Sequence, residues 1–477
     1  MKKIGDEFMA EKEIKIVDTD SKGEHGENRC PQCGASDVTY NIKKKKLICN
    51  YCYTEFEAET VEGLEKDAKN LEGETRASGT KDIDQNANDM ITLKCGGCGA
   101  EVVINTKEAT NARCHWCRSI LSINSQIENG AVPDVVLPFQ LEKQEAQKNI
   151  EAFVEKRKFF ANKTFRNEFT TKNIMGVYFP YMLVSAKAHG NFSGEGGHVA
   201  RTYTITKKNS KGEEKEETVY DIDLYDVERE FDIAINDLTI ESSQDKLNKK
   251  SKERTTNVIN AIMPFDTENC VKYKANYLAG YTSEKRDVNI SNIEEKVDAE
   301  LKDVSRHALN QDLKKYDAGV AWEKEDFEIK GKQWVSAYLP VWLYSYQDQK
   351  KVLHYVAVNA RTGETMGSIP MNKAKLFFLS ILFFLAGLLI PLLFNAEGEV
   401  VFGFALAGAI ASLVFYGIKS SKYRNQGARH TYELETKNEL SVLRRKDEET
   451  RTKRECSSST IAGANNHYIA GESVKVQ

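Results

Sequence analysis

Two long apolar blocks interrupt a chain whose hydrophobic and polar positions are otherwise mixed. Residues 376–394 and 400–418 each run for 19 positions without a charged side chain. A helix of about 20 apolar residues spans the roughly 30 Å hydrocarbon core of a bilayer. The eight Leu, five Phe and two Ile of the first block favour insertion by roughly 5 to 9 kcal/mol. The pattern therefore predicts a hairpin of two transmembrane helices, 376–394 and 400–418.

The charges around this hairpin predict its orientation. The link at 395–399 carries no Lys or Arg. The outer flanks are basic, with Lys373 and Lys375 before the hairpin and Lys419, Lys422 and Arg424 after it. Because Lys and Arg are enriched on the cytoplasmic side of membrane segments, we expect a multi-pass cell-membrane protein with two spans. Its N- and C-termini are both expected in the cytoplasm.

Small residues follow one face of the second apolar block. Gly403, Ala407 and Ala411 are spaced four residues apart, and small side chains let two membrane helices approach closely. We expect this face to pack within the hairpin, near Gly387. A homo-oligomer formed through the hairpin is the alternative.

The region from 131 to 370 has the pattern of an α+β protein. Apolar spacing predicts a helix at 141–157 and a second helix opened by a capping box at Ser291–Glu294. Period-two alternation predicts strands at 174–189, 199–207, 217–235, 334–346 and 352–360. Gly190 and the glycines at 194–197 predict a turn between the first two strands.

An internal repeat is visible in this region. Val136–Phe139 is echoed by Ile262–Phe265, and Val177–Leu183 is echoed by Ala337–Leu343. Each half then contains a Pro-Phe segment, a helical stretch and a Tyr-x-Pro strand. The repeat predicts two copies of one α+β unit, at 131–258 and 259–372.

Eight of the ten cysteines form two sets with identical C-x2-C-x15-C-x2-C spacing. The sets are Cys30, Cys33, Cys49 and Cys52, followed by Cys95, Cys98, Cys114 and Cys117. Two such pairs of thiolates are the ligands of a tetrahedral structural zinc site. Disulfides are the alternative, but they require export, and the N-terminus lacks the apolar segment of a signal peptide. We therefore predict two structural Zn2+ ions.

Other residues near these sets have weaker claims to chemistry. His115 lies between two cysteines of the second set and is an alternative ligand, although four thiolates already fill the tetrahedron. Cys270 and Cys456 have no partner in the spacing and are interpreted as free thiols. A ribbon of about 30 residues cannot bury enough apolar surface to fold alone, so metal binding is expected to supply its folding energy.

The fold class that follows is multidomain. We expect two small β zinc ribbons, a duplicated α+β cytoplasmic region and a C-terminal two-helix transmembrane hairpin. The remaining boundaries are a flexible N-terminus at 1–28, ribbons at 29–56 and 92–125, an acidic linker at 57–91 and a charged cytoplasmic tail at 419–477, whose end from Cys456 is expected to be disordered.

Composition excludes some classes of protein. The chain has 477 residues, a formal net charge of −4 and a mean hydropathy of −0.52. These values argue against a polytopic transporter and against nucleic-acid binding through overall charge. The sequence contains no P-loop, no H-E-x-x-H and no G-x-S-x-G motif. We therefore expect a protein that is not an enzyme.

The paired cysteine knuckles, the Tyr355–Pro370 segment and the Met175–Tyr181 segment together resemble the bacterial TFIIB-type zinc-ribbon-containing membrane proteins. The resemblance extends over most of residues 28–420. That family has no established activity, so the resemblance implies only the zinc ligands. Two ribbons, where one is expected, depart from the pattern.

Three functions are compatible with these features. The first is a protein-interaction adaptor or scaffold at the inner membrane face, with an unknown protein partner. The alternative is DNA or RNA binding through the first ribbon, where Lys43, Lys44, Lys45 and Lys46 form a basic run and Tyr40, Tyr51 and Tyr53 offer rings for stacking. The second alternative is an unrecognised hydrolase within 131–370.

Overall fold

The computed structural model describes most of the chain. The described residues are 14–17, 29–35, 37–58, 64, 67–80, 90–105, 112–127, 132–208, 214–242, 262–286, 288–348, 353–393, 398–424, 434 and 436–457. The predictions for most of 1–28, for much of the acidic linker, for most of the hairpin link and for 458–477 therefore lie outside the described residues.

Within the described residues, seventeen strands fall into two sheets. The small sheet contains β2 (Val38–Asn41), β3 (Lys46–Cys49) and β4 (Glu55–Phe56). The large sheet has 14 strands. They are β1 (Ile14–Val17), β5 (Gly73–Ala77), β6 (Met90–Lys94), β7 (Glu101–Asn105), β8 (Gln126–Ile127), β9 (Val135–Val136), β10 (Met175–Lys208), β11 (Glu214–Glu241), β12 (Val271–Lys272), β13 (Thr282–Glu284), β14 (Gly319–Gln347), β15 (Leu353–Asn359), β16 (Thr365–Gly367) and β17 (Asn438–Ser457).

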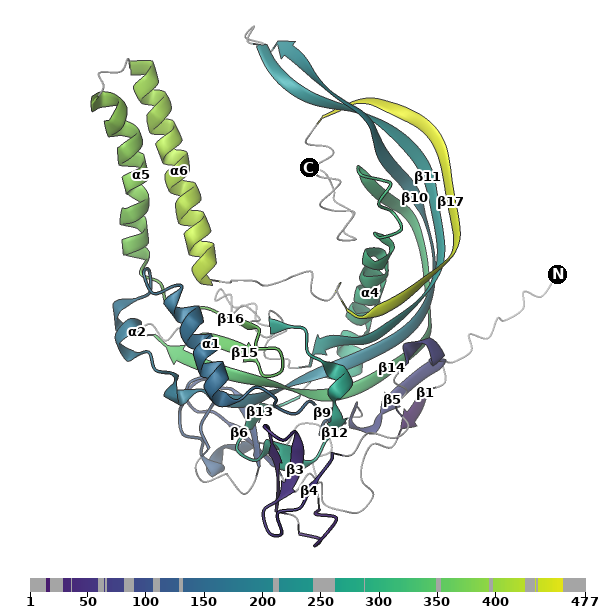
Figure 1. Ribbon diagram of the computed structural model, residues 1–477, viewed down its shortest axis with the longest axis vertical. Coiled ribbons are helices and arrows are strands. Elements are labelled where there is room, and N and C mark those ends of the chain that lie inside the picture. Colours follow the sequence, from purple (N-terminus) through teal and green to yellow (C-terminus); the bar gives the residue numbers. More distant parts are fainter. Residues whose placement is uncertain are drawn as a thin grey trace, which may run out of the picture.

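The helices lie around this sheet. The α-helices are α1 (Lys143–Glu155), α2 (Lys163–Glu168), α4 (Ile290–Leu309), α5 (Lys373–Leu393) and α6 (Gly398–Arg424). Short 3-10 helices lie at Ala68–Asn70, Ser78–Thr80, Ile123–Ser125, Thr171–Asn173, Thr267–Asn269 and Ala275–Leu278. Figure 1 shows a base from which α5 and α6 rise on one side and a curved arm of β10, β11, β14 and β17 rises on the other.

The arm is built from four long strands in antiparallel pairs. β10 pairs with both β11 and β14, and β17 pairs with the outer edge of β11. Helix α4 covers the concave face of the arm (Figure 1) and buries Ile293, Val297 and Leu301 against it. The apolar residues whose spacing predicted this helix therefore form the face that packs against the arm. The helix begins at Ile290, one residue before the expected capping box, because Asn289 and Asn292 cap it instead.

The glycines of β10 do not form the predicted turn. A Cβ on Gly190 would lie 2.3 Å from the Phe231 ring, and a Cβ on Gly194 would lie 2.0 Å from the Ala321 carbonyl oxygen. Glycine therefore permits close approach of neighbours inside one continuous 34-residue strand. The strands expected at 174–189 and 199–207 are a single element.

The two Tyr-x-Pro segments lie opposite each other in the base. Tyr178 pairs with Pro340, and Pro180 pairs with Tyr338, in the antiparallel register of β10 and β14. The rings of Tyr178 and Tyr338 lie 6.1 Å apart in a stacked arrangement. The sequence assigned these segments to successive units, whereas the structure joins both units in one sheet. The duplication itself stays a prediction.

The region after the hairpin contains a strand that the sequence did not indicate. β17 lies within the segment expected to be a charged tail, and its described part ends at Ser457, beyond the predicted start of disorder at Cys456. It pairs with β11 from Ile235↔Asn438 to Val219↔Ser457. Most of its side chains between Asn438 and Thr450 are exposed and polar, so the sequence has no apolar alternation there.

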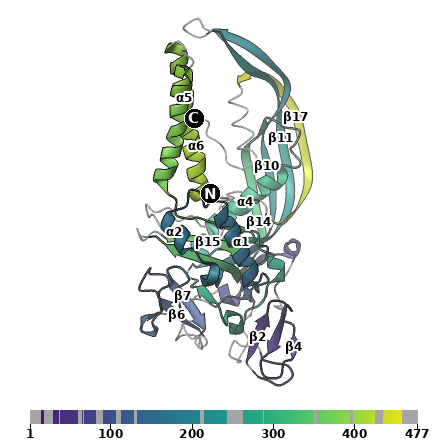
Figure 2. The same ribbon diagram turned by 60° about the vertical axis from the view of Figure 1, so that its left-hand side comes forward.

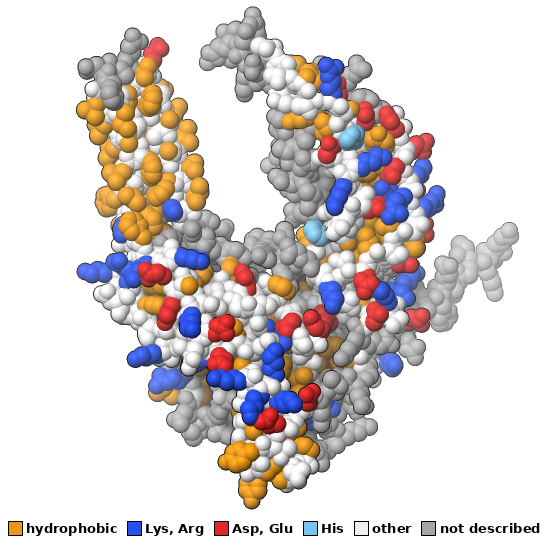
Figure 3. All heavy atoms as spheres, viewed as in Figure 1, with side chains coloured by type: hydrophobic (Ala, Val, Ile, Leu, Met, Phe, Trp, Pro, Cys, Tyr) orange, Lys and Arg blue, Asp and Glu red, His pale blue; other side chains and the backbone are white. Residues whose placement is uncertain are grey.

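Helices α5 and α6 form the hairpin. Lys373–Pro391 and Gly398–Ser420 are long and apolar enough to cross a membrane, as predicted. Their surfaces are mostly exposed, and Figure 3 shows a column of hydrophobic side chains along them. The two helices meet at Gly387 and Gly408. A Cβ added to Gly387 would lie 3.0 Å from the Cα of Gly408, and a Cβ added to Gly408 would lie 3.1 Å from the Cα of Gly387. The expected contact at Gly403 is wrong, since nothing lies within 4 Å of its Cβ position.

Candidate metal centres

The first cysteine set comes together at one end of the small sheet. The four sulfur atoms of Cys30, Cys33, Cys49 and Cys52 all lie within 4.8 Å of one another. The Cys30 and Cys52 sulfurs are 3.4 Å apart, and those of Cys33 and Cys49 are 3.6 Å apart. A tetrahedron with metal–sulfur bonds of about 2.3 Å has edges of about 3.8 Å. This cluster could therefore hold one metal ion among four sulfurs.

The second set repeats this geometry. Its four sulfurs also lie within 4.8 Å of one another, with separations of 3.4 Å between Cys95 and Cys117 and 3.6 Å between Cys98 and Cys114. The donor atoms are thiols in both clusters, and sulfur donors in a tetrahedron fit zinc. The residues present thus fit the ion that the spacing predicted.

Four matching backbone turns place the sulfurs. In each C-x2-C knuckle, the residue after the second cysteine donates its N–H to the carbonyl of the first cysteine, at 2.8–2.9 Å. Each of these residues has positive φ, at 73° for Gly34, 61° for Tyr53, 79° for Gly99 and 66° for Arg118. Glycine adopts this conformation without a Cβ penalty. In the first knuckle of each ribbon a glycine occupies this position, whereas in the second knuckle a residue with a side chain adopts the same positive φ.

Hydrogen bonds favour the thiolate form of one cysteine in each cluster. The Thr54 hydroxyl lies 3.1 Å from the Cys52 sulfur and lowers the pKa of Cys52 to about 6. A hydrogen bond with Cys114 lowers the pKa of Cys98 to about 5. The thiolate is the form that binds metal, and each cluster has one cysteine that favours it. In the same clusters the pKa of Cys33 is raised to about 12 and that of Cys114 lies above its usual value.

The expected alternative ligand, His115, lies outside the second cluster. Its Nδ1 is 3.2 Å from the Thr282 hydroxyl, its Nε2 is 3.5 Å from a Glu284 carboxylate oxygen, and its side chain is fully buried. The ring therefore contacts β13 of the large sheet rather than the four sulfurs.

The second ribbon is seated on the large sheet through this knuckle. The Trp116 indole N–H donates to Glu284 at 2.5 Å, and its ring lies 5.2 Å from that of Tyr355. The Arg118 guanidinium donates to the Leu343 carbonyl at 3.2 Å and to the Ser345 hydroxyl at 2.9 Å. Burial lowers the pKa of Arg118 to about 10. The knuckle Cys114–Cys117 is thus an internal docking surface.

The corresponding knuckle of the first ribbon is open. Tyr51 and Tyr53 occupy the positions of Trp116 and Arg118, and each is 78% exposed. Figure 3 shows hydrophobic side chains at the tip of the molecule that β3 and β4 occupy, at the end remote from α5 and α6. Figure 2 shows the two ribbons as separate lobes below the base.

The third tyrosine, Tyr40, is used within the chain. Its ring lies 5.6 Å from that of Tyr277, and burial raises its pKa. The structure therefore leaves two of the three predicted stacking rings open.

The four lysines lie at the other end of this ribbon. They occupy the β2–β3 turn and the first residue of β3, whereas Tyr51 follows the last residue of β3. Three of them pair with carboxylates of the same chain, namely Lys43 with Glu142, Lys44 with Glu55 and Lys46 with Glu57. The basic run and the open tyrosines therefore do not share one surface.

A cavity of about 1060 Å³ lies in the region of the hydrolase alternative. It is bounded by the end of α4, the start of β14 and the edge of β17, with Trp322, Leu440 and Arg445 in its lining. The Asp312 carboxylate in the lining accepts hydrogen bonds from Arg229 at 2.6 Å and from Arg445 at 2.7 Å. These contacts tie the arm together and occupy that carboxylate.

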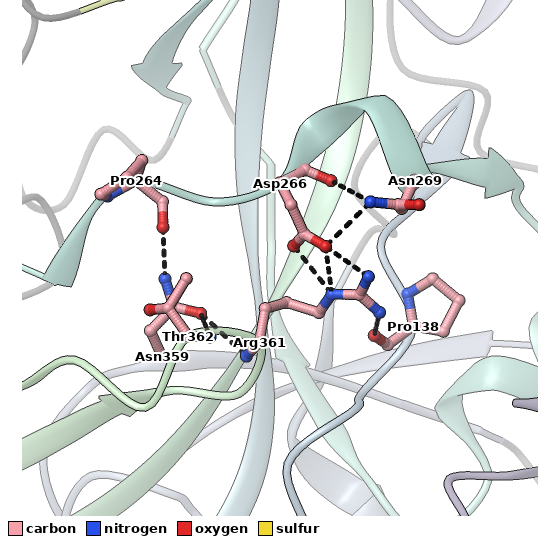
Figure 4. A network of polar contacts seen from close by, with 7 residues as sticks. All are labelled: Pro138, Pro264, Asp266, Asn269, Asn359, Arg361 and Thr362. Atoms are coloured by element: carbon pink, nitrogen blue, oxygen red, sulfur yellow. Dashed lines mark hydrogen bonds and ion pairs between the residues drawn. The ribbon is translucent and has the colours of Figure 1, made fainter.

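The Asn359–Gly363 turn within the Tyr355–Pro370 segment meets both Pro-Phe segments at a polar junction (Figure 4). Arg361 donates to the Asp266 carboxylate at 2.8 Å and to the Pro138 carbonyl at 3.1 Å. Asn359 donates to the carbonyls of Ile262 and Pro264 at 2.9 and 2.7 Å. The Asn-x-x-Thr-Gly turn thus binds both Pro-Phe segments, a structural role that the motif alone did not reveal.

Comparison with known proteins adds a distant similarity. The chain is 22% identical over 349 residues to the uncharacterized protein YdjG of Bacillus subtilis strain 168, covering 73% of this chain and 91% of that protein. No family model matches the chain, and no solved structure matches it. The similarity therefore brings no activity, and the resemblance to the TFIIB-type family stays a prediction.

Proposed function

We propose that this chain is a membrane-anchored zinc-ribbon protein that acts as a non-enzymatic protein-interaction adaptor at the cytoplasmic face of the membrane. One observation carries the proposal. The second knuckle of ribbon 2 packs its Trp116 and Arg118 into the molecule, while the same knuckle of ribbon 1 exposes Tyr51 and Tyr53. The same turn that docks internally in one ribbon is available to another protein in the other.

The chemistry of the open knuckle favours a protein partner. Tyrosine supplies large contact area and a polar hydroxyl with few rotatable bonds, and it is enriched at the energetic centres of interfaces. In ribbon 2 the docked knuckle meets aromatic rings, a carboxylate and backbone carbonyls. A partner of ribbon 1 is expected to offer a similar mixture of aromatic surface and hydrogen-bond acceptors.

The two metal ions are proposed to be Zn2+ in structural roles. The four-sulfur donor sets and their distances support this identity. When bound, zinc holds the four knuckle turns in place. Tyr51 and Tyr53 lie on the turn that contains the zinc ligands Cys49 and Cys52, and this turn exposes both rings.

Membrane anchoring through α5 and α6 supports the cytoplasmic placement. β17 follows the hairpin and pairs with β11, which precedes it, so both ends of the hairpin lie on one side of any membrane it crosses. The basic flanks favour the cytoplasm for that side. A reducing compartment also keeps cysteines available for zinc.

We also propose that residues 131–372 are a duplicated unit of the TFIIB-type family. The register supports this history, because Tyr178–Pro180 and Tyr338–Pro340 exchange places across the β10–β14 pair as two copies related by a local twofold axis would. The junction of Figure 4, where Arg361 and Asn359 hold both Pro-Phe segments, agrees with it.

Site-specific photo-crosslinking in cells tests the adaptor. A photoreactive amino acid replaces Tyr51 in the full chain, and a second chain carries it at Lys43, whose side chain is 75% exposed in the lysine turn. The adaptor predicts discrete protein adducts from position 51 that resist nuclease. Adding Tyr53→Ala should reduce these adducts.

The same experiment separates the alternatives. Nuclease-sensitive adducts from position 43 would support nucleic-acid binding instead. Absence of adducts at position 51, in a chain that retains its zinc and its membrane location, would overturn the adaptor.

A further inference from the structure

A basic segment that runs from the end of α1 into α2 lies at the foot of the hairpin. We call residues 156–166 the elbow. The Asn372 N–H donates to the Phe160 carbonyl at 2.7 Å, and the Asn162 N–H donates to the Pro370 carbonyl at 2.8 Å. The Phe160 ring lies 6.4 Å from that of Phe415 in α6. Figures 1 and 2 both show α2 beneath the start of α5.

The elbow carries five basic residues and no acidic one. Of these, Lys156, Lys158, Lys163 and Arg166 are exposed. The fifth, Arg157, is buried and donates to the Phe153 carbonyl at 2.8 Å, so it holds the end of α1. Two carboxylates flank the elbow: Glu155 pairs with Lys158 at 3.1 Å, and Glu168 accepts a hydrogen bond from the Tyr346 hydroxyl at 2.8 Å.

The start of α5 adds further positive charge beside the elbow. Lys373 and Lys375 are exposed at its first turn. The Lys375 ammonium donates to the Phe159 carbonyl at 2.8 Å and lies 3.7 Å from the centre of the Phe159 ring. The cations of two chain segments, more than 200 residues apart, therefore surround the point where the hairpin leaves the base.

An aromatic side chain projects from the middle of this basic surface. Phe159 is 58% exposed although it is a large hydrophobic residue. Aromatic rings beside lysines are typical of the boundary between hydrocarbon and headgroups. Its position at the foot of two apolar helices places it at that boundary.

We propose that the elbow binds the headgroups of anionic phospholipids in the leaflet that the hairpin enters, with Phe159 inserted beside them; the proposal rests on membrane insertion of α5 and α6. Charge complementarity and continuity with the hairpin select this occupant. Headgroups begin where the apolar surface of α5 ends, and the backbone of the elbow, which carries four exposed cations, is hydrogen-bonded to the segment that leads into α5. Basic residues next to a membrane helix attract anionic lipid in this way.

Lipid binding by the detergent-solubilised full chain tests the proposal. Fluorescent phosphatidylglycerol is the probe, and phosphatidylcholine and inorganic phosphate are the competitors. The test variant is Lys156→Gln, Lys158→Gln and Lys163→Gln together. The matched control, with the same loss of charge, is Lys296→Gln, Lys324→Gln and Lys330→Gln on α4 and the arm, where these side chains are 46–71% exposed.

The wild-type chain and the control should prefer phosphatidylglycerol, and the elbow variant should bind it roughly tenfold or more weakly. Phe159→Ala should weaken binding without changing its salt dependence. Equal binding by the elbow variant and the control, or displacement of the lipid by millimolar phosphate, would overturn the proposal.

A separate measurement distinguishes failure of membrane insertion by α5 and α6 from failure of lipid binding at the elbow. The wild-type chain is reconstituted with neutral phosphatidylcholine vesicles and then extracted with alkaline carbonate. A chain that stays with the vesicles but shows no preference for phosphatidylglycerol refutes the elbow site alone. A chain released by carbonate refutes the membrane hairpin on which the site rests.

Discussion

The residue after each second cysteine decides what each knuckle does. All four of these residues share a left-handed backbone and the same N–H to carbonyl bond. The turn involves only neighbouring residues of each C-x2-C segment, so the cysteine spacing alone could predict both clusters. The side chain at the turn is free to differ, and Tyr53 is exposed where Arg118 is half-buried and bonded to Leu343 and Ser345.

Replacing Tyr53 by glycine should separate metal binding from partner binding. Its φ of 61° costs a residue with a side chain roughly 1 kcal/mol or more. Tyr53→Gly is therefore expected to hold zinc at least as tightly as the wild type, measured by competition with a chelator. It should also lose most protein adducts from a crosslinker at Tyr51.

Arg118→Gly is the matched control for this prediction. It relieves the same strain, with φ of 66°, but removes the bonds to Leu343 and Ser345. It should therefore lower the thermal stability of the chain. A Tyr53→Gly chain that loses its zinc would contradict the prediction.

Sequence could not show which ribbon is open, because the answer depends on distant residues. Glu284 receives the Trp116 N–H from 168 positions away. The local sequence does not distinguish the two pairs of side chains. Tyr51 and Tyr53 are exposed in the structure, whereas Trp116 and Arg118 pack against the large sheet. Tertiary context decides between them.

At the scale of elements, the two ribbons differ in how they join the fold. β2, β3 and β4 form their own sheet, whereas β6 and β7 are strands of the large sheet, and β7 pairs with β13. Loss of metal from ribbon 1 should therefore stay local. Loss of metal from ribbon 2 should weaken the base.

Single cysteine replacements check this difference. Cys49→Ser should open ribbon 1 to protease and leave the main thermal transition within a few degrees of the wild type. Cys114→Ser should lower that transition clearly, because Trp116 and Arg118 lose their seat on the sheet. Similar effects of the two replacements on the main transition would show that the ribbons are joined alike.

The hairpin contact gives a second prediction at this scale. Gly387→Leu places a side chain where a Cβ already lies 2.5 Å from the Phe404 carbonyl oxygen. It should separate α5 from α6 and reduce the yield of folded protein in membranes. Gly403→Leu is the control, since nothing lies within 4 Å of the Cβ position there. Strong loss of a chemically crosslinked oligomer with Gly403→Leu would instead point to packing between chains.

Acid should release β17 from the arm. Burial alone would raise the pKa of Asp447, but hydrogen bonds from Tyr316 and Arg229 hold it below the usual value. Because the folded-state pKa is depressed, the stabilisation is present above a pH of about 4 and is lost as the pH falls through the folded pKa. Hydrogen exchange of β17, corrected for intrinsic rates, should rise below that pH.

An Asp447→Asn chain is the control for this pH dependence. It lacks the carboxylate at every pH, so β17 should exchange faster at neutral pH and change little on acidification. Protection of β17 that falls with acid equally in both chains would assign the effect to other groups.

The sequence predicted the elements that have one apolar face or an apolar surface along their whole length. The apolar period of α4 and the two apolar blocks appeared in the sequence because one face or the whole surface is apolar. β17 was missed because most of its side chains between Asn438 and Thr450 are exposed and polar. Gly190 and Gly194 misled because only the fold shows Phe231 and Ala321 occupying their space.

At the scale of the whole molecule, the order of segments constrains the topology. The chain leaves the base after β16, passes through α5 and α6, and returns to pair β17 with β11. This return requires an even number of membrane crossings. The elbow and the basic flanks then gather at one surface, and the open knuckle of ribbon 1 lies at the far end of the base (Figure 1).

The arm and the hairpin rise from the same side of the base (Figures 1 and 2). The arm carries charged side chains on its outer surface (Figure 3), and charged groups are costly in hydrocarbon. The proposed insertion of α5 and α6 into a membrane therefore requires the arm to stay in water. The hairpin contacts the base at the elbow, around Phe160 and Asn372, so the elbow is the place where the angle between them can change.

This argument predicts a change in distance on membrane insertion. Fluorophores attached through noncanonical amino acids at Thr204, exposed on the arm, and at Glu399, exposed at the start of α6, leave the cysteines untouched. Energy transfer between them should be weaker in lipid nanodiscs than in detergent, because the bilayer excludes the arm from the side of the hairpin. The same pair in a chain with Leu382→Lys and Leu406→Lys, which should not insert, serves as the control and should show no difference. Equal transfer for the wild type in nanodiscs and detergent would mean that the arm and hairpin keep their arrangement, and that α5 and α6 do not span the bilayer beside it.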